Sequence, residues 1–274
     1  MTLRRDRTIT LALAIAALVV VALAMSRSSR RAAGEAADPR RYTTTTSTTA
    51  GADIAVKGAS ATRADGGRLD TLVLTQDRLD NYQVSATTTA LRFRANAHDS
   101  GRNLRMIAWD PDVDASVDEE VCATWREQTD HHSQFGLSLR TRQDGTRWRT
   151  ITVSKNVLFA AYSNVNVHTW DTDRTTTIAT AGSVHVAGLI RTGMEVWPLP
   201  WRMCARALGD QVQVKVWPTR GPEPSWSDPR YAGSVTLPPG WVLRGRPGWY
   251  AGHLPTAGTA AATGIEARSL DPTP

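Results

Sequence analysis

Short runs with an apolar residue at every second position fill most of the chain between Leu69 and Leu270. This spacing places apolar side chains on one face of a β-strand, and past residue 26 no stretch has the spacing of an amphipathic helix. Gly, Asp, Asn and Pro separate the runs, as turns require. So many short strands predict an all-β fold, an antiparallel jelly-roll β-sandwich that forms one domain over 65–271. The predicted strands are 69–74, 82–95, 104–109, 119–125, 135–142, 148–154, 157–163, 166–170, 175–181, 184–190, 201–208, 211–217, 233–238, 248–254 and 264–270.

The clearest local prediction is a β-hairpin over 201–217. Two alternating runs flank Gly209-Asp210, and a two-residue turn that begins with Gly favours the II′ geometry. Pairing outward from this turn places Ala207 opposite Val212, which makes one face of the hairpin wholly apolar. We expect that face to lie in the core and the other face to meet water.

Cys122 and Cys204 are the two cysteines of the chain. Both fall on the polar side of their predicted strands, where a small thiol does not fill a core. A bridge between neighbouring strands explains both positions, so we predict a disulfide between them. Two unrelated free thiols are the alternative. A disulfide is typical of an oxidising compartment outside the cytoplasm.

Residues 1–26 predict an N-terminal membrane anchor or signal sequence. Residues 8–26 contain no charged side chain, and as a helix they would reach about 28 Å, close to the ~30 Å of hydrocarbon in a bilayer. This length favours an uncleaved single-pass transmembrane helix, although residues 22–24 resemble a cleavage site that would release a secreted protein. More arginines follow the segment than precede it, so the positive-inside rule alone would keep the C-terminal domain in the cytoplasm. The N-terminal position of the span and the predicted disulfide favour the opposite orientation, and we expect the C-terminal domain outside the cytoplasm.

Residues 27–64 lack apolar periodicity and include a Thr-rich run at 43–49. Such a segment cannot bury enough surface to fold, so we expect a disordered linker, either plainly solvated or O-glycosylated. The basic residues also gather near this end, because 1–41 carry +5 of the net charge of +6. A nearly neutral domain lacks the basic surface that nucleic acid needs, and nucleic acid is not an expected partner.

Four segments carry a likeness to a known group of proteins: FGLSLR at 135–140, QVQVKVWP at 211–218, PEPSW at 222–226 and PGWYAG at 247–252. They resemble the concanavalin A-like lectin/glucanase superfamily, and specifically its laminin-G-like members. The resemblance covers 65–271 and implies a jelly-roll sandwich more than it implies an activity. The glucanase branch uses a Glu-x-Asp-x-(x)-Glu triplet along one strand, and this sequence has none, nor a Gly-x-Ser-x-Gly elbow. No catalytic residue is predicted.

Asp110, Asp112 and Asp114 follow a predicted strand at alternate positions. Carboxylates at this spacing are the hard oxygen ligands that calcium loops use, and some laminin-G-like sandwiches carry calcium at a rim. Ala115 and Val121 replace the Gly and the bidentate Glu of an EF-hand, which excludes that motif. Calcium is therefore the one cofactor considered, and a solvated acidic turn is the alternative.

Six of the ten tryptophans crowd the last third of the chain, several beside Pro, Gly or Arg. Exposed aromatic rings stack on sugar rings, so this group is the candidate glycan-binding platform. The alternative is that the rings cover a sheet face. The six residues are Trp197, Trp201, Trp217, Trp226, Trp241 and Trp249.

The leading hypothesis is an extracytoplasmic, membrane-anchored domain that binds carbohydrate or another cell-envelope component without catalysis. One alternative is a glycan hydrolase or lyase whose site the sequence patterns do not reveal. Another is a structural or protein-interaction domain without a small ligand.

Overall fold

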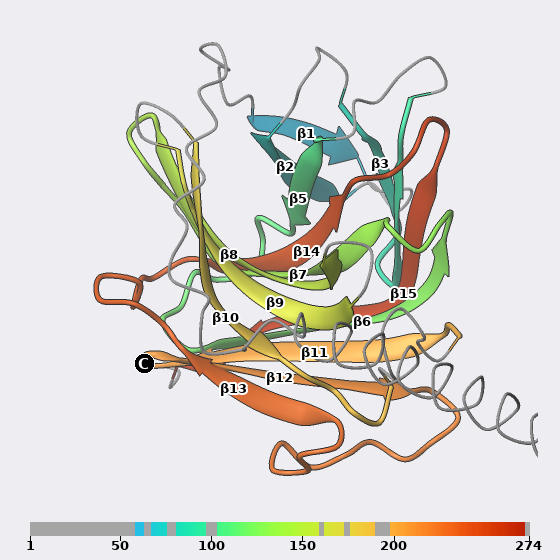
Figure 1. Ribbon diagram of the computed structural model, residues 1–274. Helices are drawn as coiled ribbons and strands as arrows, with labels where there is room; N and C mark the ends of the chain where they lie inside the picture. The colour runs from blue at the N-terminus through green and yellow to red at the C-terminus, as the bar shows by residue number, and fades with distance from the viewer. Residues whose placement is uncertain are drawn as a thin grey trace, which may run out of the picture. The chain divides into compact units, whose positions relative to one another are not determined.

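The computed structural model describes residues 58–62, 67–75, 81–96, 103–158, 162–172, 176–189 and 198–271. Over these residues the fold is all-β, with antiparallel strands in two sheets that form a sandwich (Figure 1). The predicted anchor and most of the predicted linker lie outside the described residues. Within the described ranges, no helix combines the length and the hydrophobicity needed to cross a bilayer.

The two sheets contain eight and seven strands. In spatial order, the first consists of β1 (Gly58–Thr62), β2 (Arg68–Thr75), β5 (Arg105–Trp109), β14 (Arg246–Gly252), β7 (Gln134–Asp144), β8 (Arg147–Leu158), β9 (Tyr162–Asp171) and β10 (Thr177–Val184). The second consists of β13 (Ala232–Thr236), β12 (Gln211–Pro218), β11 (Trp201–Leu208), β6 (Glu119–Gln128), β15 (Thr259–Ser269), β4 (Ala90–Arg94) and β3 (Gln83–Ala86).

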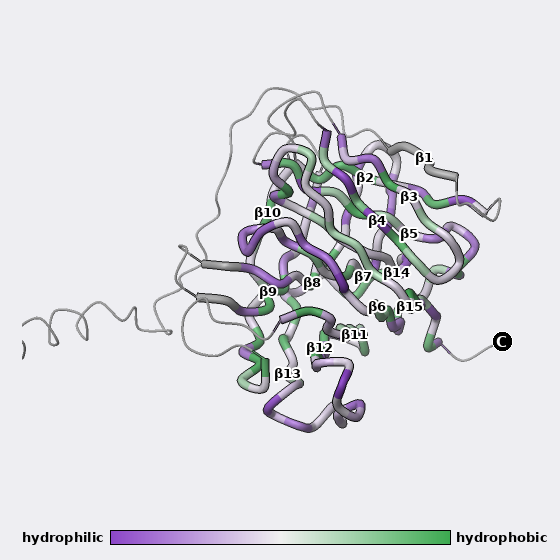
Figure 2. The backbone as a smooth tube through the Cα atoms, turned by 90° about the vertical axis from the view of Figure 1, so that its right-hand side faces the viewer, coloured by the Kyte–Doolittle hydropathy of each residue, from purple (hydrophilic) through white to green (hydrophobic). Residues whose placement is uncertain are grey.

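The main core lies between the two sheets. Trp125 of β6 packs on Phe135 of β7 with 4.9 Å between ring centroids, and Trp201 of β11 meets the same Phe135 ring edge-on at 5.9 Å. Along the tube in Figure 2, apolar and polar residues alternate on strands of both layers. This alternation is the period-two pattern that predicts a sandwich, because each strand turns one face to the core.

The predicted hairpin is confirmed by β11 and β12. Ala207 pairs with Val212, Ala205 with Val214 and Met203 with Val216, as expected from the turn. All six side chains are at most 1% exposed. Gly209 has φ of 53°, a conformation that suits Gly in this kind of turn.

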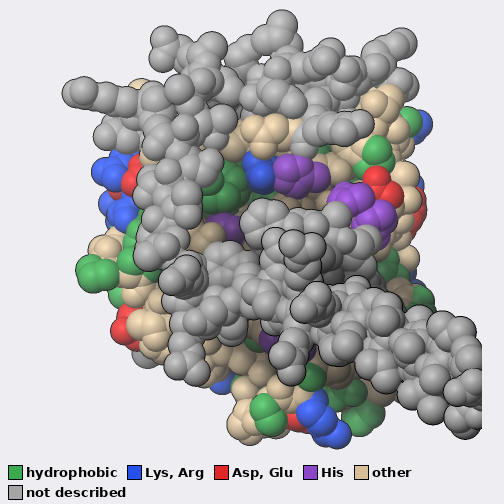
Figure 3. Space-filling view, viewed as in Figure 1, with side chains coloured by type: hydrophobic (Ala, Val, Ile, Leu, Met, Phe, Trp, Pro, Cys, Tyr) green, Lys and Arg blue, Asp and Glu red, His purple; other side chains and the backbone are tan. Residues whose placement is uncertain are grey.

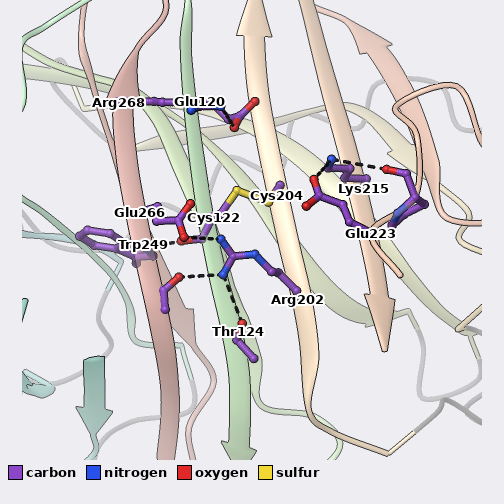
Figure 4. The surroundings of a disulfide bond; sticks show 12 residues. Glu120, Cys122, Thr124, Arg202, Cys204, Lys215, Glu223, Trp249, Glu266 and Arg268 are labelled. Carbon is purple, nitrogen blue, oxygen red and sulfur yellow. Dashed lines mark hydrogen bonds and ion pairs between the residues drawn. A yellow bond between two sulfur atoms is a disulfide. The ribbon is translucent and has the colours of Figure 1, made fainter. Parts of the chain in front are cut away.

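The predicted disulfide is also confirmed. Strand β11 pairs with β6 so that Cys204 lies directly opposite Cys122, with 4.1 Å between their Cα atoms and a bond between their sulfur atoms. Figure 4 shows the bridge on the outer face of the seven-stranded sheet, flanked by the Arg202–Glu266 and Lys215–Glu223 ion pairs. Trp217 packs against both cysteines, so the bridge is covered.

Several predicted boundaries differ from the structure, and the predicted strand 157–163 is divided between the end of β8 and the start of β9. The range 82–95 forms two strands, because Thr87 Oγ1 accepts the N–H of Ala90 and makes a turn between them. The range 184–190 leaves the sheet after Val184, and Gly188 donates its N–H to the carbonyl of Arg230 instead. Strand β1 falls in the predicted linker, where pairing with β2 supplies an order that its composition does not indicate.

Candidate functional site

Four of the six tryptophans in the predicted platform are buried, which corrects the expectation that they are exposed. Trp201 and Trp249 lie in the main core and are 2% and 3% exposed. Trp217 packs on the disulfide at 4%, and Trp241 lies at 9% with the Arg149 guanidinium 4.3 Å from its ring centroid. A ring that is buried to this extent has no accessible face on which a sugar could stack.

Trp226 is only partly buried, but two cationic side chains already contact its ring. The Arg206 guanidinium lies 4.3 Å from the ring centroid and Lys215 Nζ lies 4.4 Å from it. These cation-π contacts hold the segment after β12 against the outer face of the seven-stranded sheet. Trp197 lies outside the described residues.

The predicted calcium ligands do not converge. Asp110 Oδ1 accepts the N–H of Asp112 at 2.9 Å, so this carboxylate caps its own turn, while Asp112 and Asp114 are exposed. In the described part of the chain, no three His, Cys, Asp or Glu side chains are placed to hold a metal ion. The donor set expected for calcium is therefore not assembled by these three aspartates, and the turn interpretation fits them.

The structure does bring Asp110 and Trp249 to one hollow of about 410 Å³. Its charged side chains already have partners: Glu266 pairs with Arg202 at 2.8 Å, and Arg268 pairs with Glu120 at 2.7 Å. This hollow therefore offers little free charge for a ligand. The other residues that line it are Thr88, Val113, Ile265 and Ala267.

The sequence patterns missed a polar cluster on the outer face of the eight-stranded sheet, the face turned away from the core. In Figure 1 this sheet curves, with β8 to β10 on one side and β1, β2 and β5 on the other, so its outer face is concave. Strands β5 and β9 are four positions apart, about 19 Å in a flat sheet. The Arg105 guanidinium of β5 nevertheless lies 5.7 Å from the Trp170 ring centroid of β9. The curvature therefore gathers side chains from distant strands.

Tyr250 lies near the middle of this face. Its neighbours Trp249 and Ala251 point into the core, so the alternation of β14 turns Tyr250 outward. The Tyr250 hydroxyl donates to Gln134 Oε1 at 2.6 Å, and Gln134 Nε2 donates to Asn156 Oδ1 at 2.5 Å. Burial raises the pKa of Tyr250 to about 12, although the charge of Arg105 acts in the opposite direction. The side chain is therefore a neutral phenol at neutral pH.

Gly252 lets the Tyr250 ring lie close to the sheet, and Gly136 of β7 lets the neighbouring strand β8 approach closely. A Cβ on Gly252 would meet the Tyr250 hydroxyl at 2.5 Å and Arg105 Cγ at 3.0 Å. Gly136 pairs with Tyr250 across β7, and a Cβ there would meet the Val153 carbonyl at 2.0 Å. These glycines belong to the PGWYAG and FGLSLR segments, so the local sequence provides the space that the cluster occupies.

Arg105 is the cation of the cluster. Its Nη1 donates to Thr75 Oγ1 at 3.0 Å and to Asn103 Oδ1 at 2.5 Å, which are both neutral acceptors. It is partly buried and forms no ion pair with any carboxylate of the described residues. A cation in this setting can hold an anion, because no carboxylate of the described residues has to be displaced first.

His168 of β9 completes the set of titratable groups. Burial, with a smaller contribution from the charge of Arg105, lowers the pKa of His168 to about 4. The imidazole is therefore neutral at neutral pH. Trp170, two residues further along, donates its ring N–H to Thr152 Oγ1 at 2.8 Å and belongs to an apolar cluster with Ile107, Trp109 and Tyr250. Figure 3 shows basic and histidine side chains together in the upper middle of this view.

No protein-family model matches the chain, and no curated protein matches it in sequence. Among solved structures, it is similar to the exoplasmic/lumenal domain of VIP36 in its Ca2+/Man3GlcNAc-bound form, with 11% identity, a TM-score of 0.41, and coverage of 78% of this chain and 91% of that one. A family 7 alginate lyase in complex with product is 13% identical, with a TM-score of 0.34 and coverage of 77% of this chain and 80% of that one. The κ-carrageenase of Pseudoalteromonas carrageenovora with an oligotetrasaccharide is 11% identical, with a TM-score of 0.34 and coverage of 70% of this chain and 74% of that one.

Proposed function

We propose that the protein binds an acidic carbohydrate, one that bears carboxylate groups, on the concave outer face of the eight-stranded sheet. The observation that carries this proposal is the Arg105 guanidinium, which among the described residues has only neutral acceptors around it and lies on the same concave face as Tyr250 and His168. A guanidinium matches the planar geometry of a carboxylate and binds it through paired hydrogen bonds.

The surroundings of Arg105 favour a sugar over a polyphosphate. The described residues place one cation in this cluster, which is too few for a chain of phosphates, and residues 42–274 carry a net charge of only +1. The neighbouring polar groups are amides and hydroxyls, including Asn156 and Asn164. Such groups exchange hydrogen bonds with sugar hydroxyls and fix the orientation of a neutral ring.

We place this domain outside the cytoplasm, held to the membrane by residues 1–26 or released after cleavage. The Cys122–Cys204 bridge supports an oxidising compartment, and the uncharged segment 8–26 supports export. An acidic polymer of the cell envelope is then the ligand class that the domain would meet.

Calorimetric titration with oligogalacturonate and with a neutral cello-oligosaccharide tests the binding proposal. We expect the acidic oligosaccharide alone to bind, and Arg105→Gln to weaken it at least tenfold, as the loss of a charged hydrogen-bonding pair implies. Arg126→Gln is the matched control, because Arg126 donates to Thr263 Oγ1 on the other sheet. If acidic oligosaccharides do not bind, or if both variants bind equally well, the proposal fails.

A second candidate, cleavage of such a glycan by β-elimination, is favoured by a neutral imidazole and a neutral phenol on the same concave face, those of His168 and Tyr250. The neutral imidazole would take the proton from the carbon beside the carboxylate. The bond to the glycosidic oxygen would break with its electron pair, the phenol would protonate that oxygen, and a carbon–carbon double bond would remain. An imidazole with a pKa of about 4 is a weak base, so binding without catalysis ranks first. Ultraviolet absorbance of an unsaturated product after incubation would select the lyase instead.

A further inference from the structure

Polar side chains continue across the concave face beyond the residues already described. Arg105 of β5 pairs with Gly252 of β14, which also pairs with Gln134 of β7. Gln134 donates to Asn156 of β8, and Asn156 pairs with Asn164 of β9. A cation at one end is thus followed by three amides on successive strands.

Ser154 lies beside this row on β8. It pairs with Gly136 on one side and with Asn166 on the other, and it points away from the core because its neighbours Val153 and Lys155 have the opposite orientation. Gly136 has no side chain to cover it from that side. We refer to these four residues as the amide row: Ser154 and the amides Gln134, Asn156 and Asn164.

Two polar atoms of the amide row have no partner among the residues that the structure describes. Ser154 Oγ and Asn164 Oδ1 are buried and make no hydrogen bond to any part of the protein that the structure describes, and the Ser154 side chain is only 1% exposed. Buried polar atoms in proteins almost always have a partner, since leaving one unpaired is unfavourable. By contrast, Asn166 Oδ1 accepts from Ser183 Oγ at 2.9 Å. The unpaired atoms therefore mark a specific place on the face.

We propose that the amide row is a second subsite, which binds the ring hydroxyls of a sugar residue next to the one whose carboxylate meets Arg105. This inference rests on the proposed carbohydrate binding. The ligand class is then an oligosaccharide with an acidic residue at the β5 end and exposed hydroxyls over β8 and β9. From β5 to β9 the sheet spans up to about 19 Å before curvature shortens it, which exceeds a single sugar ring.

The test compares ligand length with the position of the substitution. Galacturonic acid, its dimer and its tetramer are titrated into the full chain by calorimetry, and into Ser154→Ala and Asn164→Ala. We expect the tetramer to bind at least tenfold more tightly than the monomer. Each substitution should weaken tetramer binding about fivefold, the equivalent of one lost hydrogen bond, and leave the monomer affinity unchanged.

Ser116→Ala is the matched control. Ser116 Oγ is likewise buried without a partner among the described residues, but its backbone pairs with Gly245 away from the amide row. This variant should alter neither affinity, and thermal unfolding of all three variants checks that each is folded. Equal affinities for monomer and tetramer, or amide-row variants that bind like the wild type, would overturn the second subsite while Arg105-dependent binding remained. Absence of all acidic-sugar binding would instead overturn the proposed function.

Discussion

The Tyr250 hydroxyl and Gln134 Oε1 lie 2.6 Å apart, in a hydrogen bond that joins two neighbouring strands above the concave face. Tyr250 is 1% exposed and Gln134 is 8% exposed, so neither group can exchange this partner freely for water. The bond fixes the orientation of the Gln134 amide, because the Oε1 atom must face the phenol. The opposite end, Nε2, then donates to Asn156 Oδ1. One tyrosine thus orients two amides of the candidate site.

Replacing Tyr250 with Phe should destabilise the fold by about 1–3 kcal/mol, because Gln134 Oε1 loses its donor while it stays buried. Urea unfolding measures the change. Tyr231→Phe is the control: its ring packs beside the disulfide cluster and is only partly buried, so we expect a change near zero. Equal stabilities for wild type and Tyr250→Phe would show that this bond contributes nothing to folding.

Gly252→Ala should also be destabilising, by about 1–3 kcal/mol, because the new methyl group would lie 2.5 Å from the Tyr250 hydroxyl. The tyrosine must move away, so acidic-sugar binding should weaken as well. The control is Gly221→Ala, since a Cβ at Gly221 meets nothing closer than 3.6 Å. Thermal unfolding of both variants gives the comparison, and a Gly252→Ala protein as stable as the control would contradict the packing argument.

The features predicted correctly from the sequence are those set by neighbours along the chain. Alternation about Gly209 gives the hairpin register, and the outward parity of Cys122 and Cys204 gives the disulfide. The same alternation places Trp201 on the inner face with Met203, so the burial of the Trp201 ring could have been predicted from the sequence. The position of a tryptophan beside Pro, Gly or Arg does not predict its burial, because proximity to a turn does not determine which face of the strand the side chain lies on.

The candidate site depends instead on which strands are neighbours. Arg105, Gln134 and Tyr250 come from β5, β7 and β14, and only the sheet order brings these strands together. Alternation shows that each side chain leaves the core but not which other side chains it meets. The curvature that brings Arg105 to Trp170 adds a further step that no local pattern contains.

Removing the disulfide in a Cys122→Ala/Cys204→Ala variant should lower the free energy of unfolding by about 4–5 kcal/mol in the chain-entropy account. The bridge closes a loop between residues 82 positions apart, so the unfolded chain gains many conformations without it. Guanidinium unfolding of wild type with and without reductant checks the same quantity. We expect reductant to shift the wild-type midpoint and to leave the variant unchanged. If the unfolding midpoint of the wild type stayed the same after complete reduction of the disulfide, the prediction would be refuted.

The pKa of His168 makes a prediction about pH. Burial and then the charge of Arg105 lower this pKa from 6.5 to about 4 in the folded state. Between these values the unfolded state binds more protons than the folded state, so stability should fall as the pH is lowered from 6.5 toward 4 and level off below. The slope for one such group approaches about 1.4 kcal/mol per pH unit. Urea unfolding at several pH values in this window measures it.

His168→Gln should flatten that slope, because glutamine carries no proton that the unfolded chain can gain. His185→Gln is the matched control, since His185 is exposed and next to the end of β10, and its slope should stay like that of the wild type. An acidic ligand at Arg105 would offset part of the charge that faces the imidazole. Bound oligogalacturonate should then make the wild-type slope shallower while leaving His168→Gln unaffected, which ties the titration to the same face as the proposed ligand.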